Sequence, residues 1–284
     1  MRILNYFLME GLSRILPRGA AEALLRFVAV PYGRISGSLK NTRENLRQAL
    51  SSDIEKRALS RIAEDNLRNF ASALCDLCYT ERLSESFIRE KVATRGLERL
   101  NEALMKDRGA ILATAHIGNW ELGGMVSSRL GYSVTAVALA HTQKSVDGAF
   151  QKRRLSNDVR VILLGGSMRG CYNVLKKNEV LAMVGDILFG KDGIEAPFLG
   201  KTLKFPGGLA RLSIATGAPI VPAFFVVESR NPTRYLLEIR QPIQGSTEGE
   251  LTRAFVEEVE TMIRRYPDQW YNFKKFWEPV VWQK

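Results

Sequence analysis

The stretch GAILATAHIGNWELGG, residues 109–124, indicates the fold of this 284-residue chain more clearly than any other segment. Its apolar run over 110–115 has the length of a buried strand. The run ends at His116, and Asn119, a preferred N-cap residue, precedes a Trp-Glu-Leu sequence that suits the first turn of a helix. We therefore expect a strand that ends at His116 and a helix that begins after Asn119. In an open α/β sheet, ligands bind at the carboxyl ends of the strands, where this histidine falls.

His116 and Glu121 have the side chains of a general base and its orienting group. A neutral imidazole can take a proton from a hydroxyl, and a carboxylate on its other nitrogen fixes the tautomer. On one continuous helix the two side chains would point about 140° apart. They can meet only if His116 lies in the turn before the helix, as the pattern predicts. The alternative is a core histidine and a carboxylate that interacts only with the helix dipole.

The hexapeptide HIGNWE resembles the H-x4-E motif of the lipid A biosynthesis acyltransferases, a branch of the lysophospholipid acyltransferase superfamily. Most of that superfamily has Asp where this chain has Glu121, so Glu after Gly-Asn-Trp favours the lipid A branch. Weaker similarities are an R-x-N-L stretch that includes Asn45 and a P-x-Q-W stretch at 267–270. The resemblance covers roughly residues 40–280 and implies the acyltransferase fold of the superfamily.

Strand-like and helical segments alternate after the motif, which predicts an α/β fold with a mostly parallel central sheet flanked by helices. A helical N-terminal region precedes it, with helices expected over 41–79 and 84–107, and the Gly-rich segment 189–208 is expected to be a loop. Strands are expected over 132–140, 159–164, 180–184, 219–228 and 235–241, and helices over 146–157, 168–178, 209–216 and 247–265.

The chain is basic, with a formal net charge of +11, which favours an anionic partner such as a membrane surface, an acidic protein or nucleic acid. Two apolar segments, 3–16 and 20–30, open the sequence, and Pro31 is expected to end the second. Both are shorter than the roughly 20 apolar residues of a spanning helix. We expect residues 1–40 to form amphipathic helices that lie in an anionic membrane interface, followed by an acyltransferase domain over 41–284. Packing on the protein's own core is the alternative.

Five further residues are candidates for substrate binding. Asp186 follows a predicted strand, and the family has an acidic residue of the active site at the matching place. The resemblance also implies a functional arginine between the motif and Asp186. The basic run 151–154 supplies Arg153, which we favour as a phosphate ligand, and Arg154, while Arg169 is a third possibility. Asn119, within the motif, completes the set.

The resemblance implies an O-acyltransferase that moves a fatty acyl chain from acyl carrier protein, or coenzyme A, to a hydroxyl of a membrane glycolipid such as a lipid A precursor. His116 would remove the hydroxyl proton, and no metal, cofactor or covalent acyl-enzyme is required. Acyl carrier protein is acidic, which suits a basic surface. The expected location is the cytoplasmic face of the inner membrane, without nucleic acid as a partner. Alternatives are a different acceptor (another glycosylated lipid, an amino-acid lipid or a lysophospholipid) and a non-catalytic basic protein that binds membrane or nucleic acid.

Overall fold

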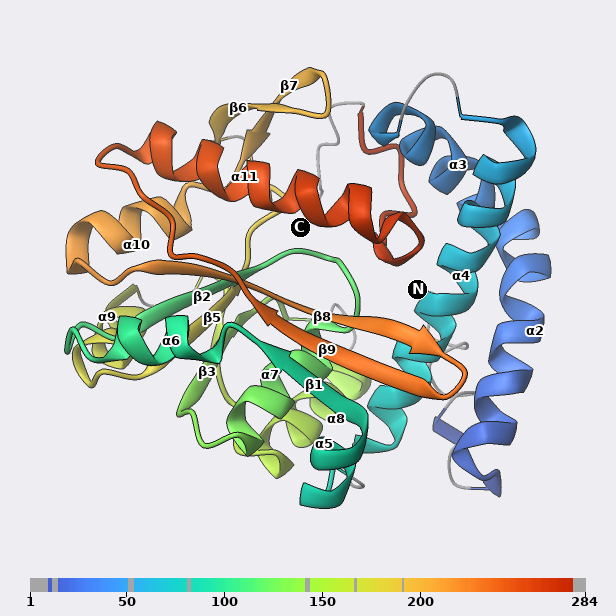
Figure 1. The fold of residues 1–284 in the computed structure, drawn as a ribbon, viewed down its shortest axis with the longest axis horizontal. Helices are drawn as coiled ribbons and strands as arrows, with labels where there is room; N and C mark the ends of the chain where they lie inside the picture. The colour runs from blue at the N-terminus through green and yellow to red at the C-terminus, as the bar shows by residue number, and fades with distance from the viewer. Residues whose placement is uncertain are drawn as a thin grey trace.

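The structure, a computed structural model, describes residues 10–11, 15–50, 54–80, 83–140, 144–165, 168–190 and 192–277. It confirms the predicted fold class, because a mostly parallel seven-stranded sheet is flanked by helices (Figure 1). The strand order is β1-β9-β8-β2-β5-β3-β4, and only the β8–β9 pair is antiparallel. The strands are β1 (Val92–Arg95), β2 (Ala110–Thr114), β3 (Val134–Ala138), β4 (Arg160–Leu163), β5 (Val180–Val184), β8 (Ile220–Arg230) and β9 (Thr233–Ile239).

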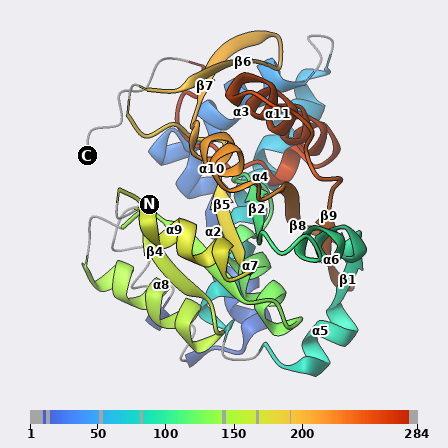
Figure 2. The ribbon, with the colours of Figure 1, turned by 90° about the vertical axis from the view of Figure 1, so that its left-hand side faces the viewer.

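Helices cover both faces of the sheet, so its central strands are buried on both sides. Figure 2 shows α10 and α11 above β2, β5 and β8, with α6 and α7 on the opposite side. In β2, Ile111 belongs to one core cluster and Leu112 to the other, since successive side chains of a strand point to opposite faces. The helices around the sheet are α5 (Glu85–Lys91), α6 (Leu97–Leu104), α7 (Trp120–Arg129), α8 (Lys144–Ser156), α9 (Met168–Lys176), α10 (Gly208–Thr216) and α11 (Glu248–Arg265).

Three N-terminal helices stand at the end of the sheet where β8 finishes (Figure 1): α2 (Arg18–Ser36), α3 (Ser38–Ala49) and α4 (Lys56–Cys78). Asp76 of α4 accepts hydrogen bonds from Arg18 Nε of α2 at 3.1 Å and from the Tyr235 hydroxyl of β9 at 2.8 Å. This buried carboxylate therefore ties the N-terminal helices to the sheet. None of the helices in the described ranges is long and apolar enough to cross a membrane.

The expected end of the second apolar segment at Pro31 is wrong, because α2 continues to Ser36 and ends at Gly37, in the left-handed conformation. A proline inside a helix costs about 3 kcal/mol, since it removes one backbone hydrogen bond. Buried Gly33, two residues later, packs so tightly on α4 that a Cβ there would lie 2.3 Å from a side-chain carbon of Leu67. Ten of the fourteen residues of the first apolar segment, 3–16, lie outside the described residues.

Two other elements differ from expectation. The segment 84–107 is not continuously helical, since the four-residue strand β1 interrupts it and pairs with β9 at the edge of the sheet. The predicted loop 189–208 contains an antiparallel hairpin of β6 (Ile194–Phe198) and β7 (Lys201–Phe205). Its two-residue turn, Leu199-Gly200, has positive φ at both positions. Leucine is rare there, and the Asn-Gly or Asp-Gly signal of such a turn is absent.

Candidate active site

His116 and Asp186 meet because β2 and β5 are neighbouring parallel strands. Thr114 lies opposite Val184, so residues two positions further along each chain, 116 and 186, lie side by side beyond the strand ends. His116 Nδ1 is 2.7 Å from Asp186 Oδ1, and the His116 backbone N–H donates to Oδ2 at 3.0 Å. The Asp186 side chain is fully buried, whereas 24% of the His116 side chain is exposed. A buried carboxylate thus fixes the orientation of the partly exposed imidazole.

This arrangement defines the tautomer of His116 and moves its pKa. Burial disfavours the imidazolium, but the negative charge of Asp186 and its hydrogen bond outweigh burial, and Glu121 adds to them, so the pKa of His116 is raised. Because an ionised Asp186 only accepts hydrogen bonds, Nδ1 carries the proton and Nε2 keeps the lone pair. The Trp120 ring stands edge-on to the imidazole at 4.7 Å between centroids. These contacts leave Nε2 as the basic nitrogen.

The expected hydrogen bond between His116 and Glu121 is replaced by the one from His116 to Asp186. Glu121 instead accepts two hydrogen bonds from Arg154, from Nε at 2.9 Å and Nη2 at 2.6 Å. The reason is that Glu121 lies in the first turn of α7, beside the buried guanidinium of α8, whereas Asp186 shares the strand edge with His116. Glu121 acts on His116 through space, as one of the charges that raise its pKa.

The arginines predicted to bind phosphate have other partners. Arg154, whose side chain is 6% exposed, is engaged by Glu121, and Arg153, 12% exposed, forms an ion pair with Glu10. Both guanidiniums of this run therefore contact carboxylates of the protein itself, and a phosphate contact of either arginine stays a prediction. Arg169 lies exposed at the start of α9, and its phosphate contact stays a prediction.

Asn119 is the N-cap of α7, as the sequence predicts: its side chain accepts from the Leu122 N–H at 3.2 Å. Its Nδ2 donates to the Ala73 carbonyl of α4 at 3.1 Å, so the buried amide holds the turn, and a contact with substrate stays a prediction. Gly118 in the same turn has φ of +63°, and a Cβ there would lie 2.1 Å from the Phe225 carbonyl oxygen. Glycine is required at that point because β8 passes directly beneath it.

The C-terminal segment holds the histidine turn in place, a role that the sequence did not reveal. The Tyr271 N–H donates to the His116 carbonyl and the Gly118 N–H to the Gln269 carbonyl, both at 2.8 Å. The Gln269 side chain is fixed in turn by two hydrogen bonds to the Val227 backbone of β8. The P-x-Q-W stretch therefore adds a short strand-like partner to the motif turn.

Asparagines of α3 and α4 secure this C-terminal segment. Asn66 donates to the Trp270 carbonyl at 2.7 Å and Asn45 to the Asn272 carbonyl at 3.0 Å. All four residues are buried. Asn66 thus holds the P-x-Q-W stretch itself, and Asn45 of the R-x-N-L stretch holds the residues that follow it, which connects the N-terminal helices to the His116 turn.

Comparison with known proteins identifies the family. The family model described as bacterial lipid A biosynthesis acyltransferase matches residues 3–278. The chain belongs to this family. Similar relatives are a phosphatidylinositol mannoside acyltransferase of Mycobacterium tuberculosis (strain ATCC 25618 / H37Rv), 28% identical over 189 residues, that of Mycolicibacterium smegmatis, 22% over 281, and the lipid A biosynthesis palmitoleoyltransferase of Escherichia coli (strain K12), 25% over 232.

The matched regions differ in extent. They cover 64% of this chain and 58% of the M. tuberculosis protein, 96% and 90% for the M. smegmatis protein, and 80% and 74% for the E. coli protein. The chain therefore matches less than two thirds of the length of the M. tuberculosis relative. The family resemblance expected from HIGNWE is confirmed.

Proposed function

We propose that the protein is an O-acyltransferase that moves a fatty acyl chain from a thioester to a hydroxyl of a membrane glycolipid. The observation that carries this proposal is the His116–Asp186 pair at the carboxyl ends of β2 and β5, with one imidazole nitrogen held and the other available. Family membership supports the reaction class. The relatives' names, a lipid A acyltransferase and phosphatidylinositol mannoside acyltransferases, support a sugar-bearing lipid as acceptor.

In the proposed reaction, Nε2 of His116 takes the proton of the acceptor hydroxyl as its oxygen attacks the thioester carbonyl carbon. The new C–O bond gives a tetrahedral intermediate, and its collapse breaks the C–S bond. The leaving thiolate receives the proton from the imidazolium, so the products are an ester and a free thiol. Asp186 stabilises the imidazolium by direct contact. Glu121 stabilises it through the negative charge of its carboxylate, and Arg154 holds that carboxylate in place.

The donor is proposed to be acyl carrier protein, with coenzyme A as the alternative. An acidic carrier suits a chain of net charge +11, because opposite charges accelerate the encounter of two proteins. The acceptor is proposed to be a lipid A precursor or a mannosylated phosphoinositide. These two sugar lipids correspond to the two kinds of relative.

The test is an acyl-transfer assay with purified protein, both thioester donors and both glycolipid acceptors. His116→Ala should lower kcat/KM by about 10²–10⁴-fold, the usual contribution of a general base. An exposed residue elsewhere, Met105→Ala on the turn after α6, serves as the matched control and should leave kcat/KM unchanged. Transfer by the His116 variant within a few-fold of the control would refute the proposal.

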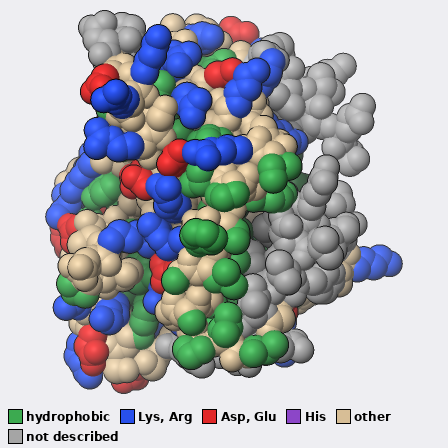
Figure 3. Space-filling model, turned by 90° about the vertical axis from the view of Figure 1, so that its right-hand side faces the viewer, with side chains coloured by type: hydrophobic (Ala, Val, Ile, Leu, Met, Phe, Trp, Pro, Cys, Tyr) green, Lys and Arg blue, Asp and Glu red, His purple; other side chains and the backbone are tan. Residues whose placement is uncertain are grey.

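We further propose that the membrane-associating part predicted over 1–40 acts through the outer face of α2, on the cytoplasmic face of the inner membrane. Five apolar side chains recur there at helical spacing and are exposed: Leu24, Phe27, Val28, Tyr32 and Ile35. Figure 3 shows hydrophobic side chains along this helix with lysines and arginines on the neighbouring surface. Ile35 is 88% exposed and Phe27 is 77% exposed, which is unusual for large apolar side chains in water.

Vesicle co-sedimentation tests this outer face. Phe27→Glu with Ile35→Glu should weaken binding to vesicles that contain phosphatidylglycerol by about tenfold or more, since each buried apolar side chain contributes about 1.5–3 kcal/mol. Met105→Glu, which adds one negative charge at a residue that is 79% exposed, should bind as the wild type does. Equal losses in both proteins would show that added negative charge, not the outer face of α2, is responsible.

A further inference from the structure

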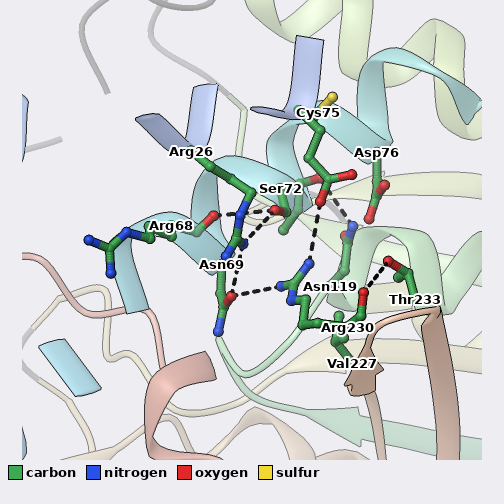
Figure 4. Close-up of polar contacts among 12 residues, drawn as sticks. Arg26, Arg68, Asn69, Ser72, Cys75, Asp76, Asn119, Val227, Arg230 and Thr233 are labelled. Carbon is green, nitrogen blue, oxygen red and sulfur yellow. Dashed lines mark hydrogen bonds and ion pairs between the residues drawn. The ribbon is translucent and has the colours of Figure 1, made fainter. Parts of the chain in front are cut away.

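Two arginines from different parts of the chain converge on one uncharged oxygen near the inner side of α2. Arg26 Nη1 is 3.2 Å from Asn69 Oδ1, and Arg230 Nη2 donates to the same oxygen at 2.8 Å. Arg26 also donates to the Ser72 hydroxyl at 3.1 Å. Figure 4 shows both guanidiniums pointing toward Asn69, one from α2 and one from the end of β8. Two positive groups thus share a neutral acceptor.

Of the two guanidiniums, only that of Arg230 has a direct ion pair with a carboxylate among the described residues. Glu22 is the one that Arg230 reaches, at 3.4 Å, and Glu22 also contacts Arg18 at 3.5 Å. Among the described residues, no carboxylate lies within ion-pair distance of Arg26. Asp65 is bound to Arg68, a further positive group that acts on Arg26.

Asp268, the remaining acidic residue of the cluster, accepts from Asn69 Nδ2 at 2.7 Å, and burial raises its pKa. The pKa of Arg26 is lowered, by burial and then by the charge of Arg230. The two guanidiniums repel each other, and Glu22 contacts Arg230 but forms no ion pair with Arg26, so a further anion between them would be favourable. A phosphate group can do so, because its several oxygens accept from two planar guanidiniums at once.

We propose that Arg26 and Arg230 form a binding site for the phosphate group of a lipid headgroup. Arg26 precedes Phe27 and Val28, which belong to the exposed apolar face of α2, so a phosphate at Arg26 would lie at the depth of a headgroup when that face enters a bilayer. Arg230 keeps 31% of its side chain exposed, which leaves the pair accessible. Among the described residues, no hydrogen bond or ion pair joins Arg26 or Arg230 to His116 or Asp186, so the site is separate from that pair.

The same chemistry would also accept a soluble phosphate ester, so the test has two arms. In the first, the full chain binds phosphatidylcholine vesicles with or without phosphatidic acid. In the second, the melting temperature of the protein is measured with and without glycerol phosphate in a buffer free of other phosphate. Arg26→Gln is the test variant, and Arg34→Gln is the matched control, because Arg34 lies on the same helix and is 66% exposed.

The site predicts that Arg26→Gln binds phosphatidic acid vesicles about 10–100-fold more weakly than Arg34→Gln, the range for lost hydrogen bonds to a charged group. Without phosphate, Arg26→Gln should melt no lower than the wild type, since it relieves repulsion with Arg230. A rise of the wild-type melting temperature with glycerol phosphate, absent in the variant, would assign the site to soluble esters as well; a response to vesicles alone assigns it to lipid.

Arg26→Lys keeps the charge but loses the planar fork, and it should also bind more weakly than Arg34→Gln. If Arg26→Gln unfolds, this variant decides the matter. Equal vesicle binding by the Arg26 and Arg34 variants, with no response to glycerol phosphate in the wild type, would overturn the proposal and leave only diffuse attraction between a basic protein and an anionic surface.

Discussion

The two carboxylates beside His116 have different surroundings. Asp186 lies 70 positions from the histidine and yet accepts its Nδ1–H and its backbone N–H. Glu121 lies within the same motif, only five positions away, and is bound by the buried guanidinium of Arg154. Strand register brings the distant carboxylate into contact, while helix geometry turns the near one toward α8. Spacing along the chain is therefore a poorer guide to a catalytic pair than the order of strands in the sheet.

The largest difference between the two carboxylates is expected in turnover. Asp186→Asn should lower kcat by about 10–10³-fold, since the base remains but its tautomer and imidazolium lose their support. Glu121→Gln should lower kcat less, because it removes a charge that acts through space. Steady-state kinetics on both variants would measure this. A larger loss in the Glu121 variant would reverse the roles assigned here.

A smaller effect is expected in stability. Arg154→Gln should lower the free energy of unfolding by about 3–5 kcal/mol, because it leaves Glu121 without its partner in a largely buried site. The matched control is Arg160→Gln, whose partner Glu179 is as buried as Glu121 but whose own side chain is 50% exposed, against 6% for Arg154. That change should cost about 1 kcal/mol or less. Urea unfolding curves of equal slope would compare the two; equal losses would show that the Arg154–Glu121 pair behaves as an ordinary surface pair.

Much of the fold follows from the sequence because its strands are apolar runs with clear ends. Strand β5 and the ends of α11 were predicted within one residue. The short edge strand β1 was missed, since only Val92 of its four residues is even partly buried. The hairpin of β6 and β7 was missed because a leucine with positive φ makes its turn. Such strands depend on tertiary contacts, which the local sequence pattern does not encode.

The sequence predicted the main residues of the candidate site but not the contacts between them. His116 at a strand end, Asn119 as an N-cap and Asp186 on the same sheet edge all follow from apolar runs and their boundaries. That Asp186 rather than Glu121 holds the imidazole depends on β2 and β5 being neighbours in register, which no local pattern encodes. The hydrogen bonds from Asn45 and Asn66 to the C-terminal segment span more than 200 positions, so the sequence pattern could not predict them either.

The assignment of Asp186 as the partner of His116 is tested most directly by the pKa of that histidine. The chain has two histidines, so a His141→Gln variant assigns the imidazole signals in an NMR titration. In the wild type the pKa of His116 should lie above the ordinary value of 6.5. The value of kcat/KM should rise as the pH passes through the pKa of His116, because the neutral base then forms. Asp186→Asn should lower this pKa and move the rise to lower pH. A Glu121→Gln/Arg154→Gln double variant, which removes both charges of the neighbouring pair, should change the pKa much less. A larger fall in the double variant than in Asp186→Asn would contradict the assignment.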